Sequence, residues 1–358
     1  MEATGMSEVV AQVHGRAGQI TLNRPKALNA LSLQMIRDMA SALLAWQEDD
    51  RIEVVVVRGQ GREGPFGAFC AGGDLRFFHE AVLAGDPRLE DFFTEEYALN
   101  HLVHGYPKPY VTFMDGIVMG GGMGISQGAH CRIVTERTRM AMPETNIGLF
   151  PDVGGGWFLA RCPGRLGEYL ALTGDMLGAG DALEAGLADA ELPSRELPTL
   201  WDRFANEGAA AMPARQLAPV GRLAGLRDDI DRIFALPTVV DIVRALEGSG
   251  SEWATQTAAV LRKRSPLMLH VTLEQVRRGR ALELAGDLRM ERDVVRHCFH
   301  LRPGTASETV EGIRALVIDK DHAPKWNPAR IEDVTPEMVA AFFDSPWPMH
   351  AHPLRALA

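Results

Sequence analysis

Residues 108–124 read KPYVTFMDGIVMGGGMG, which is an apolar run followed by a turn and a glycine run. The apolar run at Tyr110–Phe113 predicts a buried strand, and Asp115-Gly116 predicts a turn. The three glycines at 120–122 open a segment, Gly122–Gly128, that predicts a helix. A helix N-terminus leaves backbone N–H groups unpaired and carries a positive partial charge, so it suits an anionic oxygen. This stretch therefore predicts an α/β arrangement with a binding turn between a strand and a helix.

The same alternation runs through the first half of the chain, from Val9 to about Pro193. Short β-branched or apolar runs predict strands, and glycine-rich turns separate them from helical stretches. The predicted strands are Gln19–Leu22, Val54–Val57, Tyr110–Phe113 and Cys131–Thr135. The predicted helices are Ser32–Gln47, Leu75–Leu83, Gly122–Gly128 and Gly156–Arg161. We expect the α/β fold class.

Amphipathic helical patterns replace the glycine turns beyond Pro198. They cover Leu200–Asn206, Val239–Glu247, Glu252–Lys263, Leu267–Leu284 and Leu288–Phe299. Gly208–Asp229, which contains an alanine run and two prolines, predicts a linker or irregular surface segment. We therefore expect two regions, with residues 1–195 forming the α/β core and residues 196–358 forming a mainly helical C-terminal region.

The composition favours a small-molecule ligand over a nucleic acid. The 358 residues carry a formal net charge of -10, and Lys and Arg form no long run. Four scattered cysteines predict no disulfide framework, and the histidine spacings predict no metal site. Met1–Val10 has neither an apolar stretch nor an Arg-rich face, and no apolar run reaches the length of a membrane span. These features predict a cytoplasmic protein with no nucleic-acid or membrane partner.

A second glycine turn lies at residues 69–74, FCAGGD. Two glycines between an apolar run and a helix let the backbone turn sharply and present bare N–H groups. An ordinary strand-to-helix turn explains this short motif equally well. Together with the first turn, however, it suggests that the N–H groups of Gly73 and Gly121 form an oxyanion hole.

Two carboxylates lie in residues 142–156, MPETNIGLFPDVGGG. An acid in apolar surroundings has a raised pKa, which suits general acid and base chemistry near neutrality. Glu144 could instead begin a helix after Pro143, and Asp152 could cap the next helix. Because three glycine-rich features share one α/β unit, we favour the catalytic interpretation.

These motifs resemble those of the crotonase (enoyl-CoA hydratase/isomerase) superfamily. The resemblance rests on residues 23–31, on Ala71–Asp74, on Asp115-Gly116 before the glycine triple, and on Pro143-Glu144 before Gly148. Within the superfamily, the chain is similar to the 3-hydroxyisobutyryl-CoA hydrolases, which serve valine catabolism. The segments that carry this similarity are 108–110, 141–145, 148–156, 170–174, 311–315, 318–321 and 324–326.

The resemblance implies a spiral of repeated ββα units, with an acyl-CoA thioester oxygen bound by the N–H groups of Gly73 and Gly121. It implies no cofactor, because coenzyme A is part of the substrate. Family hydratases use a second glutamate two residues after the glycine triple, where this chain has Gly124. The hydrolases instead pair the Pro-Glu carboxylate with a following Asp, and this chain has Glu144 and Asp152. Hydrolysis of a 3-hydroxyacyl-CoA is therefore the expected reaction.

Four further residues are candidates for substrate binding, and one of them, Glu96, matches a family position. Glu96 lies near the acyl group in the family and could bind a 3-hydroxyl, although a solvated helix glutamate is an equal alternative. Ala71 begins the Ala-Gly-Gly-Asp turn. Lys26 and, more weakly, Lys320 could meet the phosphates of coenzyme A. We expect Glu144 to act as nucleophile or general base, with Asp152 orienting the substrate hydroxyl or the water.

Other functions remain open at this point. The chain could be an enoyl-CoA hydratase or isomerase, or a non-catalytic acyl-CoA binder. Residues 124–128, GISQG, fit a serine nucleophile elbow, but Ser126 would lie inside a helix and not at the turn. The same glycines imitate a dinucleotide fingerprint only faintly. The acyl group is undetermined among 3-hydroxyisobutyryl, 3-hydroxypropionyl and other short chains. A homo-oligomer is possible, and so is a C-terminal region that covers the site within one chain.

Overall fold

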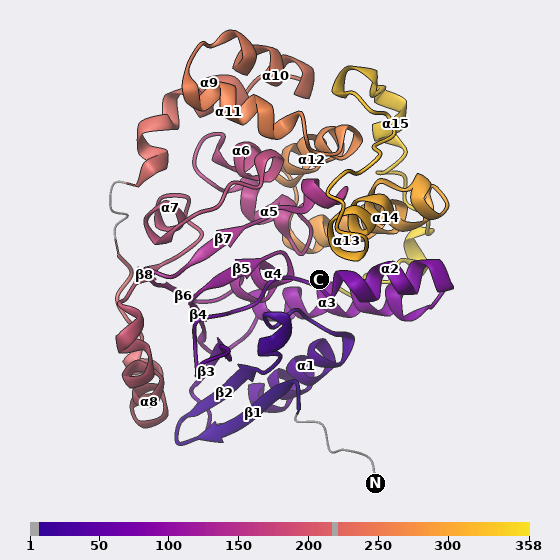
Figure 1. The fold of residues 1–358 in the computed structure, drawn as a ribbon. Helices are drawn as coiled ribbons and strands as arrows, with labels where there is room; N and C mark the ends of the chain where they lie inside the picture. Colours follow the sequence, from indigo (N-terminus) through magenta and orange to yellow (C-terminus); the bar gives the residue numbers. More distant parts are fainter. Residues whose placement is uncertain (1–6, 217–220) are drawn as a thin grey trace. The chain divides into compact units, whose positions relative to one another are not determined.

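Six strands form the main sheet of the computed structural model, in the order β1-β2-β3-β4-β6-β8 (Figure 1). The structure describes residues 7–216 and 221–358. The strands are β1 (Val9–His14), β2 (Ala17–Leu22), β3 (Val54–Gly59), β4 (Tyr110–Met114), β6 (Cys131–Val134) and β8 (Ala190–Glu191). β1 pairs with β2 in antiparallel fashion, and every later pairing is parallel. The sheet therefore grows in chain order, as a spiral requires.

A second, shorter layer of backbone pairing follows β2, β3, β4 and β6. β5 (Ile117–Met119) comes directly after β4, and β7 (Arg139–Ala141) after β6, and these two pair with each other. Isolated parallel bridges join Leu31 to Gly73 and Cys70 to Val118. The chain thus repeats a long strand, a short strand and a helix, which is the expected ββα unit.

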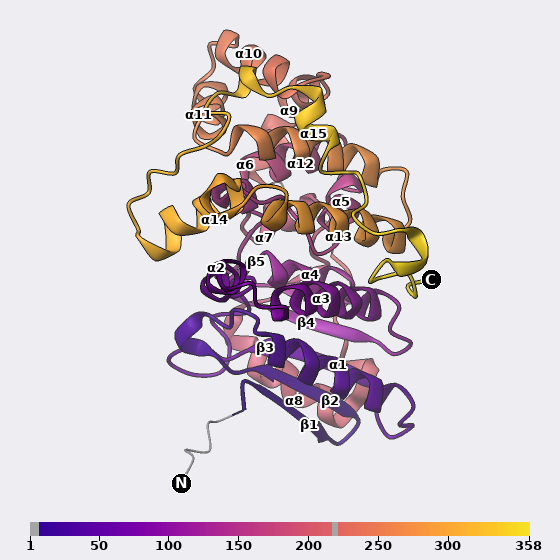
Figure 2. The same ribbon diagram turned by 90° about the vertical axis from the view of Figure 1, so that its right-hand side faces the viewer.

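The main sheet carries helices on both faces. Val54 to Val57 are all buried, because a parallel strand covered on both sides needs apolar residues without alternation. α8 (Leu197–Glu207) packs Leu200, Trp201 and Phe204 into a core with Val54, Val56 and Phe113. α1 (Leu33–Gln47), which begins after its N-cap Ser32, contacts β1 and β2. Figure 2 shows α1 and α8 on opposite sides of these strands.

The chain divides into two compact units, neither of which is contiguous. Unit 1 comprises Met1–Gly73, Leu99–Met140 and Met176–Gly221, and holds the main sheet. Unit 2 comprises Asp74–Ala98, Ala141–Asp175 and Arg222–Ala358. Residues 196–221 group with unit 1, so these units do not coincide with the predicted regions 1–195 and 196–358. That division stays a prediction based on composition.

The remaining helices complete each unit. α4 (Gly121–Gln127) and α7 (Ala179–Glu184) belong to unit 1, and α3 (Arg88–His104) passes from unit 2 into unit 1. The other α-helices belong to unit 2: α2 (Leu75–Ala84), α5 (Gly155–Ala160), α6 (Leu166–Thr173), α9 (Arg227–Phe234), α10 (Val239–Gly248), α11 (Glu252–Leu261), α12 (Pro266–Gly279), α13 (Leu284–His300), α14 (Glu308–Ile313) and α15 (Pro336–Ala340).

The predicted strands correspond to β2, β3, β4 and β6, and most predicted helices are present within a few residues. The prediction of one helix over Leu267–Leu284 is wrong, because α12 ends at Gly279 and α13 begins at Leu284. A Cβ on Gly279 would lie 2.2 Å from the carbonyl oxygen of Gly156, so this close approach requires glycine where the helix ends.

Two further predictions need correction. Gly208–Asp229 is not irregular throughout: Gly208–Ala211 and Arg222–Leu226 are 3₁₀ turns and α9 begins at Arg227, while residues 217–220 lie outside the described residues. α3, a helix of 17 residues, was absent from the predicted set. Its buried residues include Leu89, Phe92, Tyr97 and Asn100, so burial around the helix weakens a one-sided periodicity. The prediction about Met1–Val10 also rests partly on residues outside the described range.

Candidate active site

The two glycine turns lie against each other within unit 1. The Cys70 N–H donates to the carbonyl oxygen of Ile117 at 2.9 Å, and the Met119 N–H donates back to Cys70 at 3.0 Å. Gly72 has a left-handed φ of +107°, and a Cβ there would lie 3.8 Å from the Gly121 nitrogen. The short second layer of pairing therefore brings the Gly72-Gly73 turn beside the start of α4.

Both turns present backbone donors. Gly121 is the first residue of α4, so its N–H has no partner within the helix. The Leu31 N–H donates to the carbonyl oxygen of Gly72 at 2.8 Å, and in this parallel bridge the N–H of Gly73 points away from Leu31. Gly122 must lack a side chain, because its Cβ would lie 2.4 Å from the Cys70 oxygen. Such paired donors suit an oxygen that gains negative charge.

Two other predicted residues of unit 1 lie in the Gly72-Gly73 turn or in the loop bonded to it. The Ala71 N–H donates to the carbonyl oxygen of Leu28 at 3.0 Å, which ties the turn to the loop after β2. Lys26 lies in that loop, in a 3₁₀ turn over Pro25–Ala27, and is exposed. Its charge therefore remains available to solvent near the glycine turns.

Ser126 lies inside α4, as its sequence position predicts, and is completely buried. Its hydroxyl donates to the carbonyl oxygen of Gly122 at 2.8 Å and lies 3.2 Å from that of Met123. A serine nucleophile needs an exposed hydroxyl at a strand-to-helix turn with a base beside it. The geometry of Ser126 therefore disfavours the serine hydrolase alternative.

Glu144 begins a 3₁₀ turn, Glu144–Ile147, in unit 2 and is buried with 7% exposure. Among the described residues, its Oε2 has no hydrogen-bond partner. Burial raises the pKa of Glu144 well above its usual value, and the charge of Asp152 raises this pKa further. Glu144 is thus more basic than an ordinary carboxylate, and its Oε2 is not occupied by another protein group among the described residues.

Asp152 is buried and accepts a hydrogen bond from the hydroxyl of Tyr97 at 2.8 Å. Burial raises the pKa of Asp152 to about 6, while the hydrogen bond from Tyr97 opposes the increase. Tyr97 is itself fully buried in α3. The hydroxyl therefore holds the Asp152 carboxylate in one orientation and favours its ionised form.

Glu96 completes a group of three acids that we call the acid cluster: Glu96, Glu144 and Asp152. Only 2% of Glu96 is exposed, and its Oε1 has no hydrogen-bond partner among the described residues. Burial raises the pKa of Glu96 well above its usual value, and the charges of Asp152 and Glu144 add to the rise. The alternative of a solvated helix glutamate is therefore wrong, because α3 turns this side chain inward.

An aromatic group accompanies the acid cluster in unit 2. The rings of Phe93 and Tyr97 are 6.2 Å apart, and those of Phe93 and Phe299 are 5.4 Å apart. Phe78 and Phe92 extend the group, with ring centroids 4.7 Å apart. Because these aromatic side chains exclude water, the carboxylates of the acid cluster are poorly solvated, which accounts for their raised pKa values.

The C-terminal helices hold the turn that carries Glu144. The Ser265 N–H, before α12, donates to the carbonyl oxygen of Thr145 at 3.2 Å, and the Thr309 hydroxyl donates to that of Gly148 at 2.6 Å. A Cβ on Gly148 would lie 2.2 Å from the backbone carbonyl oxygen of Glu308. The helices of the second half therefore fix the position of the turn that carries Glu144.

The structure adds residues that the sequence motifs did not reveal. Tyr97 lies in the helix that was not predicted, and Asp287, Glu291 and Gln275 lie at buried positions of α13 and α12. Acids four residues apart on an amphipathic helix are usually solvated, so no local signal marked them. Lys320, by contrast, is exposed after α14 and has a left-handed φ of 57°.

Within residues 7–216 and 221–358, no group of His, Cys, Asp and Glu side chains could hold a metal ion. Over the same ranges, no helix combines the length and the apolar character that crossing a membrane demands.

The profile of the enoyl-CoA hydratase/isomerase family matches residues 17–343. The chain is 41% identical to a protein of Xenopus tropicalis named "3-hydroxyisobutyryl-CoA hydrolase, mitochondrial", over 92% of this chain and 87% of that protein. The name assigns that relative to mitochondria, and the cytoplasmic prediction for this chain gains no support.

Two solved structures have the same fold. One, described as an enoyl-CoA hydratase from Rhodobacter sphaeroides 2.4.1, has a TM-score of 0.88 at 40% identity and covers 95% of this chain and 98% of its own. The other, described as a carnitinyl-CoA dehydratase from Mycobacterium thermoresistibile, has a TM-score of 0.88 at 39% identity, covering 96% and 98%. These similarities confirm the predicted crotonase-like α/β fold.

Proposed function

Because the chain belongs to the enoyl-CoA hydratase/isomerase family, we propose that it hydrolyses the thioester of a short-chain 3-hydroxyacyl-CoA such as 3-hydroxyisobutyryl-CoA. One observation carries the choice of hydrolysis: Glu144 and Asp152 share one buried acid cluster, while α4 has glycine at residue 124. Hydratases of this family need a second glutamate at that position. Without it, the acid and base pair for adding water to a double bond is incomplete.

In the proposed reaction, the thioester oxygen accepts hydrogen bonds from the N–H groups of Gly73 and Gly121. The ionised Glu144 either attacks the carbonyl carbon, giving a mixed anhydride, or takes a proton from a water that attacks it. The negative charge that develops on oxygen is stabilised by the two donors. The C–S bond then breaks, coenzyme A leaves as a thiolate and is protonated, and water supplies the second oxygen of the product acid.

Asp152 and Glu96 would orient the substrate in this scheme. Asp152, fixed by Tyr97, can bind the incoming water or the 3-hydroxyl. Glu96 offers a free carboxylate oxygen in the same cluster, which suits a hydroxyl donor. Lys26 and Lys320, which are exposed, are proposed to meet the phosphates of coenzyme A. The C-terminal region is proposed to cover the site, and homo-oligomer formation stays a prediction.

A panel of short acyl-CoA and enoyl-CoA substrates tests the proposal. We expect thiol release from 3-hydroxyisobutyryl-CoA and 3-hydroxypropionyl-CoA, measured with a thiol reagent, and no loss of the enoyl absorbance from crotonyl-CoA. Hydration without thiol release would favour the second candidate, a hydratase, which the names of the two solved structures suggest for those proteins. Binding of acyl-CoA without either reaction would identify a non-catalytic binder.

Glu96→Met is expected to lower kcat/KM for 3-hydroxyisobutyryl-CoA by about 10- to 100-fold, because the 3-hydroxyl loses its acceptor in a buried site. Isobutyryl-CoA, which lacks the hydroxyl, should change by less than about threefold. The ratio of the two substrates cancels any effect of Glu96 on the other acids. Glu95→Met, on the same helix, is the matched control and should leave the ratio unchanged. An unchanged ratio in Glu96→Met would rule out this role.

A further inference from the structure

The turn that follows Asp152 is strained and needs support from elsewhere in unit 2. Val153 has a φ of 56° and Gly154 a φ of 86°, so two successive residues are left-handed. A β-branched residue rarely adopts this conformation, and it persists only when its surroundings fix it. The Gly155 N–H donates to the backbone carbonyl oxygen of Asp152 at 2.8 Å and closes the turn.

A carboxylate from α13 provides that support. The Glu291 Oε2 accepts from the Gly154 N–H at 2.7 Å, and its Oε1 accepts from the Gly156 N–H at 2.8 Å. Glu291 is fully buried, and Gly154, the N-cap of α5, has no side chain with which to cap the helix. Glu291 therefore takes the place of the missing cap, although it lies 137 residues after Gly154 and 135 residues after Gly156 in the sequence.

Gln275 of α12 holds the other side of the same turn. Its Nε2 donates to the carbonyl oxygen of Pro151 at 2.6 Å and to the Glu291 Oε1 at 2.9 Å. Pro151 precedes Asp152 and Gly154 follows Val153, so both flanks of the two residues are fixed by one connected group. Asp287 binds the next residue of α5, because its Oδ2 accepts a hydrogen bond from the Trp157 N–H at 3.0 Å. α5, α12 and α13 contact one another in unit 2 (Figure 1).

The backbone of Gly156 packs directly against this group of side chains, so a side chain at residue 156 would displace them. A Cβ on Gly156 would lie 2.6 Å from the Asp287 Oδ1 and 3.0 Å from the Gln275 Nε2. Two buried acids, Asp287 and Glu291, are also costly to keep together, since burial raises the pKa of Glu291 and raises that of Asp287 to about 7. Apolar residues would pack the helices at lower cost, so the acids act on the turn they bind.

We propose that Glu291 and Gln275 are positioning residues. Glu291 holds the N–H groups of Gly154 and Gly156, Gln275 holds the carbonyl oxygen of Pro151, and together they set the orientation of the Asp152 carboxylate. The inference rests on the proposed function, because Asp152 acts in that reaction. Glu291 does not itself touch the substrate. Its effect passes through Asp152 and should disappear when Asp152 no longer contributes.

A double-mutant cycle on the full chain tests this. Glu291→Gln keeps the size of the side chain but offers one accepting oxygen to two N–H groups. We expect kcat for thiol release to fall by about 10- to 100-fold, with KM changed by less than about threefold. In an Asp152→Asn background, the same change should lower kcat by less than about threefold.

A second variant keeps the test valid if Glu291→Gln folds poorly. Gln275→Met removes both donors of Gln275 at similar volume and should show the same loss and the same non-additivity. Glu274→Gln, an exposed surface pair with Arg278, is the control and should leave kcat unchanged. Full, additive losses in the Asp152→Asn background would overturn the proposal, as would near-wild-type kcat in both variants. If the wild-type chain released no thiol, the proposed function would fail instead.

Discussion

Glu144→Gln is expected to lower kcat for thiol release by about 10³-fold, since both proposed routes require a carboxylate at this position. The amide is a poor base and a poor nucleophile, yet it has nearly the same shape. Acyl-CoA should therefore still bind, with a Kd within about threefold of wild type in calorimetry. The buried Glu144 has no partner at Oε2 among the described residues, so the substitution breaks no hydrogen bond there.

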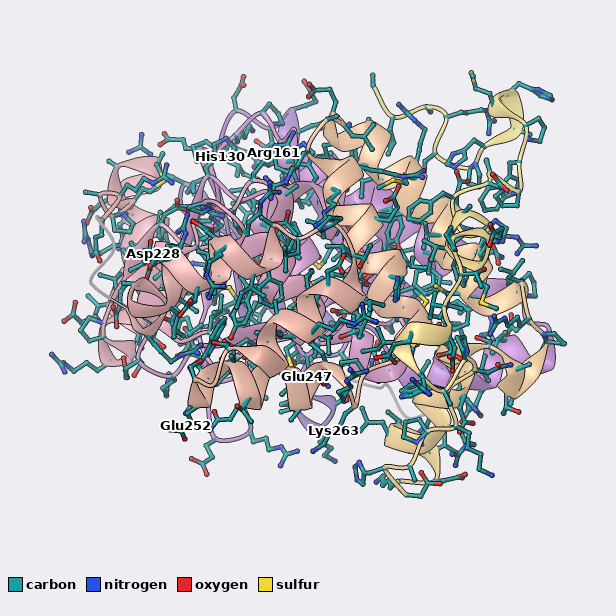
Figure 3. The ribbon with its side chains drawn as sticks, turned by 90° about the horizontal axis from the view of Figure 1, so that it is seen from above. His130, Arg161, Asp228, Glu247, Glu252 and Lys263 are labelled. Carbon is teal, nitrogen blue, oxygen red and sulfur yellow. The ribbon has the colours of Figure 1, made fainter. Side chains whose placement is uncertain are left out.

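A matched control separates chemistry from general damage. Glu252, exposed in the first turn of α11 and labelled in Figure 3, also belongs to unit 2. Glu252→Gln should keep wild-type kcat. Near-normal thiol release by Glu144→Gln with intact binding would refute the assignment of Glu144.

Solvent oxygen distinguishes the two routes that Glu144 could follow. In one turnover with excess enzyme in ¹⁸O water, direct attack by water places the label only in the product acid. A mixed anhydride opened at the Glu144 carbonyl leaves the label in that side chain instead. Mass spectrometry of the peptide containing Glu144 therefore identifies a covalent route when the label is found in the enzyme.

Much of the fold could be predicted because the local signals agree with the tertiary structure. Val54 to Val57 are apolar without alternation, and a parallel strand covered on both faces requires this pattern. Ser32 marks the start of α1 because its side chain accepts the Met35 N–H. The glycine turns were predictable for the same reason, since Gly72 has a backbone conformation that favours glycine.

The surroundings of the acids could not be predicted in this way. Tyr97 reaches Asp152 from 55 residues earlier in the chain, and Glu291 reaches Gly154 from 137 residues later. Neither residue lies in a motif with a fixed spacing, and only tertiary packing brings them together. The C-terminal helices, predicted from composition as a separate region, also hold the Glu144 turn through Ser265 and Thr309. Sequence therefore identified the candidate acids but not the residues that orient them.

Asp152→Asn is expected to lower kcat by about 100-fold and to change the pH dependence of the reaction. Burial raises the pKa of Asp152 to about 6, so the Asp152 contribution to kcat/KM should be lost as pH falls through about 6 and the carboxylate takes up a proton. Asparagine cannot titrate, so this part of the decrease should be lost in the variant. Asp228→Asn, at an exposed position in the first turn of α9 (Figure 3), should keep the wild-type profile.

Tyr97→Phe tests independently whether the ionisation of Asp152 controls the pH dependence of the reaction. The Tyr97 hydroxyl donates to ionised Asp152 and lowers its pKa, so its removal should raise the pKa and move the decrease in kcat/KM to higher pH. Asp152 remains present in this variant, so the decrease itself should persist. A profile that shifts to lower pH, or one that stays unchanged in both Tyr97→Phe and Asp152→Asn, would mean that another acid controls the reaction.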